Sequence, residues 1–147
     1  MRLIAVLSGL VALGSVTAPV AAGVDTQRSS ALPLETMTFD EVVSARAAGT
    51  GCTWLGGSGF TRRMSMKEDR GAVKRNGRII TLHPAAGAEE VFPYTFHRWS
   101  GGGMDVSIEN SGREVRRGPE HVETIATLTL IESGRSRSWP GRLSCGS

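Results

Sequence analysis

Two cysteines, Cys52 and Cys145, bracket most of the chain, and it contains no others. In an oxidising compartment such an isolated pair is expected to form one disulfide. The bond would close a loop of about 94 residues, which the chain-entropy model values at roughly 4 to 5 kcal/mol of stability. The fold must then bring the two ends of this region together. Redox or metal-binding thiols are the alternative, but the sequence has no Cys-x-x-Cys spacing and no clustered histidines.

The N-terminus predicts which compartment the protein occupies. Residues 1–22 begin with Met1 and Arg2, continue as an uncharged apolar run and end in small residues before Gly23. This pattern is typical of a signal peptide cleaved at an Ala-x-Ala-like site, so we expect a periplasmic or secreted protein. A retained membrane anchor is the alternative, because an uncharged stretch of about 20 residues is long enough to span a bilayer. No second run of that length follows, so no transmembrane span is expected after cleavage.

Two regions are predicted after the cleavage site. Residues 23–37 mix Ser, Thr, Pro and Gly without periodicity, which indicates a flexible leader. Residues 38–147 are expected to form a single β-rich domain. It opens with a short helix over about 39–48, because Thr38 and Glu41 have the spacing of a capping box. Four apolar residues share one face of this helix: Phe39, Val42, Val43 and Ala47.

The clearest strand signal is an Asn-Gly pair, Asn76-Gly77, between two strand-like runs. Asn and Gly readily take the positive φ angles of a type I′ turn, so we predict a two-residue hairpin. A loop of this length sets the register, pairing Arg75 with Arg78 and Val73 with Ile80. The hairpin should therefore bury an apolar face made of Val73, Ile80 and Leu82.

Further alternating segments are separated by turn signals at intervals of about 8 to 15 residues. The turns are expected at Gly101-Gly102-Gly103, Asn110-Ser111-Gly112 and Ser133-Gly134. The sequence thus predicts a mainly β fold of about seven strands, forming a small antiparallel barrel or sandwich. In such a fold the disulfide would join the first and last strands and suppress the open edges of the sheet.

We find no residue pattern that indicates catalysis or a cofactor. The three histidines, His83, His97 and His121, lack the paired spacing of metal ligands, so no metal site is predicted. Ser58 stands in a glycine-rich run but lacks the last glycine of Gly-x-Ser-x-Gly, and the same run lacks the Lys-Ser/Thr of a phosphate-binding loop. We therefore predict a protein that is not an enzyme and has neither catalytic residues nor a cofactor.

The strongest local bias is a run of basic residues around the predicted hairpin, opposed only by Glu68 and Asp69. On a shared face, these cations would raise the local potential and attract an acidic partner. A solvated surface without a partner is the alternative. Export argues against nucleic acid, so an anionic envelope component is the better partner. The candidate binding residues of the run are Arg62, Arg63, Lys74, Arg75 and Arg78.

Several short motifs resemble the periplasmic inhibitors of C-type lysozyme. They are Cys52, the run 69–82 with its Asn-Gly turn, the Ser100-Gly101 step, and residues 126–130 before Cys145. The resemblance implies a small antiparallel barrel with a disulfide between its beginning and end. It also implies that Ser100 and Gly101 lie in the loop that enters the lysozyme cleft. The family carries Ser-Gly-x-x-Tyr in this loop, whereas Met104 follows Gly103 here.

Two functions are compatible with these features. The first is an exported, non-enzymatic binding protein of the cell envelope, possessing either the basic hairpin or the glycine-rich loop as its contact surface. It would bind a protein or an anionic envelope component, and a lysozyme-inhibitor-like module is one version of it. The second is an exported enzyme whose active site is assembled from dispersed residues. A filled barrel with a protruding loop favours binding, and a pocket with convergent titratable groups favours catalysis.

Overall fold

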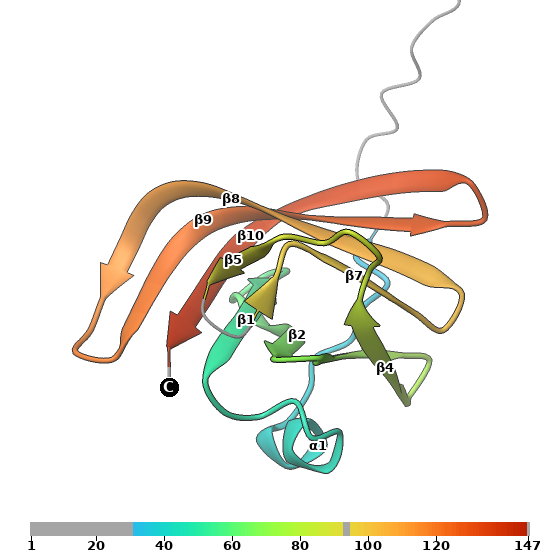
Figure 1. Ribbon diagram of the computed structural model, residues 1–147, viewed down its shortest axis with the longest axis horizontal. Coiled ribbons are helices and arrows are strands. Elements are labelled where there is room, and N and C mark those ends of the chain that lie inside the picture. The colour runs from blue at the N-terminus through green and yellow to red at the C-terminus, as the bar shows by residue number, and fades with distance from the viewer. Residues whose placement is uncertain (1–30, 93–94, 147) are drawn as a thin grey trace, which may run out of the picture.

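A computed structural model describes residues 31–92 and 95–146, and eight antiparallel strands in it close into a barrel (Figure 1). The mainly β architecture predicted from the sequence is confirmed, with one barrel strand more than the expected seven. The barrel strands are, in chain order, β1 (Gly51–Gly56), β2 (Thr61–Lys67), β3 (Arg70–Arg75), β4 (Arg78–Pro84), β7 (Arg98–Gly101), β8 (Met104–Arg117), β9 (His121–Glu132) and β10 (Arg135–Gly146). A separate two-stranded sheet consists of β5 (Glu90–Phe92) and β6 (Thr95–Phe96).

The barrel closes where the first strand pairs with the last. β1 runs antiparallel to β10, and Cys52 stands directly opposite Cys145 in this pairing. The two cysteines form a disulfide, as the sequence predicts. Backbone hydrogen bonds and a covalent bond thus join the same two strands, so this seam has no free sheet edge.

The predicted hairpin is confirmed in its turn and its register. Asn76 and Gly77 have φ angles of 50° and 71°, as a type I′ turn requires. Arg75 pairs with Arg78, and Val73 pairs with Ile80. Val73 and Leu82 are buried in the barrel core, and Ile80 packs against it.

The turn predicted at Asn110-Ser111-Gly112 is wrong, because β8 continues through it to Arg117. The register shifts between Asn110 and Glu114, so residues 111–113 form a bulge opposite Ile125 of β9. The Gly112 N–H donates to Asn110 Oδ1 at 2.9 Å, and Ser111 Oγ donates to the Ile125 carbonyl at 2.9 Å. These local hydrogen bonds satisfy polar groups of the bulge while the strand continues in the same direction. The turn-forming residues therefore bend the strand and do not reverse it.

The interior of the barrel is filled by side chains that alternate along the strands. Its largest members are tryptophans, and Trp54 and Trp99 have no exposed surface. Gly56 and Gly141 pair across β1 and β10, and a Cβ atom on either would lie within 2.5 Å of the Trp54 ring. Glycine at both positions therefore makes room for this indole. The core consists of Leu34, Cys52, Trp54, Met64, Met66, Val73, Leu82, Trp99, Met104, Val106, Ile108, Ala126, Leu128, Leu130, Trp139, Leu143 and Cys145.

Helix α1 (Phe39–Ser44) lies against the outside of the barrel and is shorter than predicted (Figure 1). The Thr38 capping box is confirmed. The helix ends early because Arg46 takes a φ of 58° and donates its N–H to Val43, in a Schellman-type termination.

The predicted apolar face of this helix is half correct. Val42 and Ala47 are buried, whereas Phe39 and Val43 are 62% and 49% exposed. Phe39 and Val43 are four residues apart and so share the outward side of a helix of six residues.

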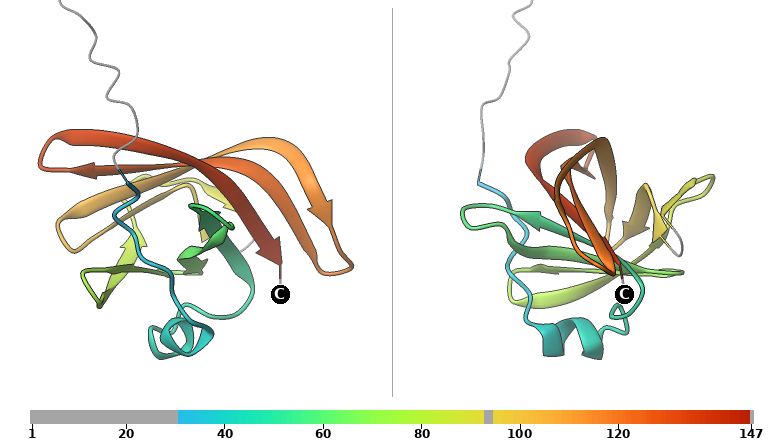
Figure 2. Two further views of the ribbon diagram at one scale, coloured as in Figure 1. Left: turned by 180° about the vertical axis from the view of Figure 1, so that it is seen from behind. Right: turned by 90° about the vertical axis from the view of Figure 1, so that its left-hand side faces the viewer.

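Residues 31–37 depart from the flexible leader predicted for 23–37. They run along the outside of the barrel to the helix (Figure 2). Leu34 and Met37 are buried, and the Glu35 N–H donates to the Lys74 carbonyl at 2.8 Å. Burial of these two apolar side chains fixes a segment whose composition alone resembles a linker. The predicted signal peptide and residues 23–30 lie outside the described residues.

Candidate functional site

Two of the predicted basic residues hold other segments of the chain in place. The Arg63 guanidinium donates to the carbonyl oxygens of Leu34 at 2.9 Å and Gly56 at 3.3 Å. It thereby ties residues 31–37 to the barrel. Lys74 Nζ lies 2.6 Å from Glu41 Oε1, which joins β3 to helix α1. The hydrogen bond from Lys74 lowers the pKa of Glu41, and the N-cap bond with Thr38 adds to this effect.

The other three basic residues have different surroundings. Arg75 Nη1 lies 2.6 Å from Glu132 Oε1 in β9. The Arg62 guanidinium lies 5.9 Å from the centroid of the Phe39 ring. Arg78 is exposed and forms no ion pair with the residues that the structure describes. The run of cations is thus divided among several local contacts, and Arg78 is the member whose charge stays open to solvent.

Ser100 and Gly101 line a hollow of about 430 Å³ between the β7–β8 and β9–β10 turns. Ser100 Oγ donates to the carboxylate of Asp105 across the first turn. A Cβ atom at Gly101 would lie 2.5 Å from the carbonyl oxygen of Thr81, so glycine lets β7 end against β4. The pair indicated by the family resemblance therefore ends strand β7 beside an open turn, and Gly101 is also required there for the packing of β7 against β4.

A second hollow, of about 260 Å³, adjoins the first at the β9–β10 turn. Arg135 and Arg137 line it, together with Leu130, Glu132 and Ser133. Neither arginine was among the predicted binding residues, although the alternating Arg-Ser-Arg-Ser after the predicted turn could have indicated them. The hydrogen bond from Arg75 lowers the pKa of Glu132, and the charges of Arg75 and Arg137 lower it further.

These two hollows and the β3–β4 turn form what we call the barrel end, comprising residues 75–78, 100–105 and 131–137. The β7–β8 and β9–β10 turns lie on the right of Figure 1, and both turns lie on the left when the molecule is seen from behind in Figure 2. The Arg75–Glu132 ion pair joins the β3–β4 turn to the β9–β10 turn. The guanidinium of Arg137 lies 6.0 Å from the centroid of the Trp139 ring. The barrel end can therefore present guanidinium groups to an acidic partner.

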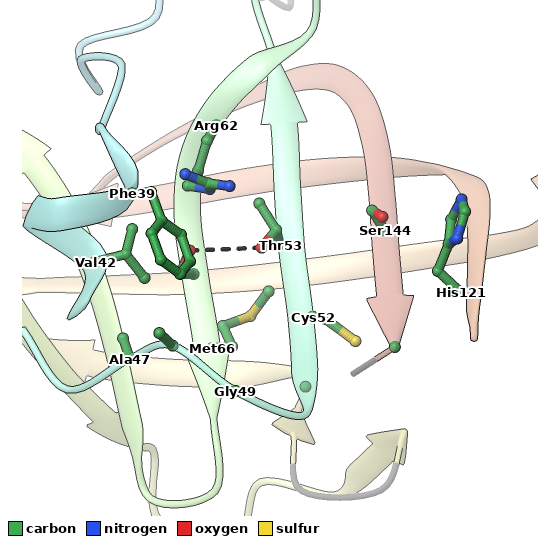
Figure 3. Close-up of a pocket in the computed structure, with 14 residues that line it drawn as sticks. Phe39, Val42, Ala47, Gly49, Cys52, Thr53, Arg62, Met66, His121 and Ser144 are labelled. Atoms are coloured by element: carbon green, nitrogen blue, oxygen red, sulfur yellow. Dashed lines mark hydrogen bonds between the residues drawn. The ribbon is translucent and has the colours of Figure 1, made fainter. Parts of the chain in front are cut away.

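A different cavity, of about 260 Å³, lies between helix α1 and the outer face of the barrel, and we call it the helix groove (Figure 3). Its lining residues are Phe39, Val42, Ala47, Ala48, Gly49, Gly51, Cys52, Thr53, Arg62, Ser65, Met66, His121, Ser144 and Gly146. Three hydroxyl side chains form its floor in one row across β2, β1 and β10, because Thr53 pairs with Ser65 on one side and with Ser144 on the other.

The walls of the helix groove differ in character. Phe39 and Arg62 lie on one side of the hydroxyl row, and His121 lies on the other (Figure 3). Thr53 Oγ1 and Ser65 Oγ are 3.5 Å apart. The Ser144 hydroxyl and the His121 ring have no hydrogen-bond partner among residues 31–92 and 95–146. The groove thus offers unused hydrogen-bonding groups beside an apolar helix wall.

Neither region is identified by similarity to a known protein. Comparisons of the chain with protein-family models, curated proteins and solved structures found no match. Among the described residues, no group of three or more His, Cys, Asp and Glu side chains is placed to hold a metal ion. No helix in the described part of the chain is long and apolar enough to cross a membrane.

Proposed function

We propose that this protein is an exported, non-enzymatic binding protein of the cell envelope that engages an acidic partner at the barrel end. The observation that carries the proposal is the pair of hollows beside Glu132, whose carboxylate is already bound by Arg75. Arg135 and Arg137 line one hollow and are exposed to solvent. Glu132 already neutralises Arg75, so an acidic group that enters this hollow would pair with the guanidinium groups of Arg135 and Arg137.

The filled interior supports binding rather than catalysis. Seventeen buried residues occupy the barrel core, including all three tryptophans. The carboxylates that line the larger hollow are engaged, Asp105 by Ser100 and Glu132 by Arg75. Export is supported by the signal-like pattern of residues 1–22 and by the Cys52–Cys145 disulfide.

Lysozyme inhibition is the specific version of this function that the sequence resemblance suggests. Ser100 and Gly101 are half-buried at the end of β7, next to the exposed turn at Gly102-Gly103 that a large partner would reach. A glycosidase cleft carries two catalytic carboxylates, so it is an acidic surface that arginines can contact. Purified mature protein should then slow the lysis of cell walls by C-type lysozyme. Unchanged lysis at a large molar excess would eliminate this version.

The general proposal is tested by co-sedimentation of the protein with isolated cell envelopes. The variant Arg135→Gln/Arg137→Gln removes two charges from the barrel end. Its matched control is Arg113→Gln/Arg116→Gln, which removes two exposed charges from the opposite end of β8. We expect the first variant to lose most envelope binding and the second to keep it. Equal losses in both variants would show that net charge, rather than the barrel end, governs the interaction.

A further inference from the structure

We propose that the helix groove is a second, independent binding site, and that its ligand is a single sugar unit bearing a carboxylate. The proposal does not rest on the function assigned to the barrel end, because the two regions share no lining residue. The groove is hydrophilic along its floor and carries one arginine, a combination that matches a hydroxylated monoanion.

The floor supplies the contacts that a sugar ring requires. Ser65, Thr53 and Ser144 stand in one row on three adjacent strands, and the hydroxyl oxygens of Thr53 and Ser65 lie 3.5 Å apart. A hydroxyl both donates and accepts, so a row of three can match the alternating hydroxyls of a sugar. Ser144 makes no side-chain hydrogen bond within the described residues, so its hydroxyl is available to a ligand.

Arg62 supplies the cation that a carboxylate requires. Its side chain is half-buried and its guanidinium, which lies over the ring of Phe39, forms no ion pair with the described residues. A planar guanidinium binds a carboxylate through two parallel hydrogen bonds. The carboxylate of a ligand lying along the hydroxyl row would meet Arg62 at the helix side of the groove (Figure 3).

The acidic residues on the surrounding elements are mostly engaged elsewhere. No carboxylate belongs to the described lining of the groove. Glu41 of helix α1 is bound by Lys74, and Glu123 of β9 is bound by Arg142 at 3.0 Å. Asp40, in the first turn of the helix, is exposed to solvent. Arg62 is therefore the permanent charge within the lining itself, and Lys67 Nζ lies beside the lining residue Gly49.

The volume of the groove and the charges in its lining limit the class of ligand that it can bind. The cavity of about 260 Å³ is smaller than the roughly 300–1,000 Å³ of sites that enclose drug-sized ligands, which favours one sugar unit over an oligosaccharide. Phosphate sites are built from several cations or from converging backbone N–H groups. The lining has one arginine and a row of hydroxyls, a set that matches the hydroxyls and single carboxylate of a sugar acid.

The test is a titration of the ¹⁵N-labelled protein with glucuronate, followed by NMR. Glucose is the matched control, because it has the same ring without the carboxylate. We expect saturable shifts at the amides of Thr53, Ser65 and Ser144 with glucuronate, and much weaker binding of glucose. Absence of saturable shifts, equal binding of both sugars, or shifts confined to the barrel end would each overturn the proposal.

Variants locate the interaction within the groove. Arg62→Gln should weaken glucuronate binding by about tenfold, the effect of losing one charged hydrogen-bond partner. Ser144→Ala should weaken it less, and it tests the floor even if Arg62→Gln perturbs the fold. Arg78→Gln and Arg135→Gln/Arg137→Gln should bind as the wild type does, and a loss in either would contradict the assignment to the groove.

The same titration distinguishes two sources of such a ligand. The methyl glycoside of glucuronate imitates a uronate unit at the end of a polysaccharide, whereas glucuronate itself represents a free sugar acid. Binding of both would favour a polysaccharide end, and binding of the free acid alone would favour a small metabolite. Failure of both forms overturns the proposal and leaves the envelope binding of the barrel end untouched.

Discussion

The barrel end and the helix groove are built in opposite ways. The barrel end consists of tight turns that need glycine and of arginines on the strands that flank them. The helix groove consists of side chains on paired strands, bounded on one side by a helix that a capping box and an ion pair hold in place. The first region gains accessibility from its turns, and the second gains a fixed geometry from its strands.

This difference indicates which kind of partner each region suits. Exposed arginines beside hairpin turns adapt to a large surface, where electrostatic attraction speeds association. A row of hydroxyls in strand register cannot adapt to the same extent, so it selects a small ligand of matching shape. Substitutions in the core or at the disulfide should therefore weaken the structure of the groove more than that of the barrel end. Substitutions in the turns should weaken the barrel end more than the groove.

Removal of the disulfide is the strongest test of that comparison. Cys52 lines the helix groove, and its partner Cys145 follows the floor residue Ser144. We expect Cys52→Ser/Cys145→Ser to lose up to about 4 to 5 kcal/mol of unfolding free energy, measured by urea denaturation. In hydrogen exchange, the amide of Thr53 should lose more protection than that of Ser107, which lies in β8 near the barrel end. Equal losses at both would mean that the seam does not specifically support the groove.

A substitution at the glycine-rich turn tests the other region. Gly101→Ala places a Cβ atom 2.5 Å from the Thr81 carbonyl oxygen, so β7 must move away from β4. We expect a loss of roughly 1 to 3 kcal/mol and weaker envelope binding. Gly103→Ala is the matched control, because its Cβ meets no atom within 4 Å and its cost, about 1 kcal/mol, comes from a φ of 77°. A smaller effect at Gly101 than at Gly103 would refute the packing argument.

The fold was largely predictable because its signals are local. An Asn-Gly pair is sufficient to define a hairpin and its register, and the cysteine pair indicates which strands close the barrel. Asn110-Ser111-Gly112 misled the prediction because the same residues that form a turn can form a bulge, and long-range pairing with β9 decides between them. Burial of Leu34 was equally invisible, since Leu32, Leu34 and Met37 are too few to define a periodicity in a segment interrupted by Pro33.

The candidate sites were less predictable because they depend on contacts between distant segments. The basic run gave no sign that Lys74 and Arg75 would meet Glu41 and Glu132, which are 33 and 57 positions away. The hydroxyl row across β2, β1 and β10 is likewise scattered through the chain. Ser100 and Gly101 were predicted from a family resemblance. The close approach of Gly101 to Thr81 was not predicted, because it depends on the pairing of β4 with β7.

The helix wall of the groove gives a smaller expected effect. Thr38 Oγ1 accepts the N–H of Glu41 at 3.2 Å, so Thr38→Ala removes the cap of helix α1. We expect a loss of about 1 kcal/mol in urea denaturation, together with weaker glucuronate binding. Thr38→Ser retains the hydroxyl and should behave as the wild type does. Reduced envelope binding by Thr38→Ala would contradict the independence of the two regions.

The smallest expected effect concerns the ion pair at the barrel end. Arg75 holds the pKa of Glu132 below its ordinary value of 4.5, so this carboxylate supports the folded state above that pH and loses the contribution as the pH falls through its lowered pKa. In Arg75→Met, a ¹³C NMR titration should find the pKa of Glu132 raised towards 4.5, with the pKa of Glu41 unchanged. In Lys74→Met, the pKa of Glu41 should rise and that of Glu132 should stay unchanged, because Lys74 lowers the pKa of Glu41. If either variant moved both carboxylates, the barrel end and the helix wall would be electrostatically coupled, and their treatment as separate regions would fail.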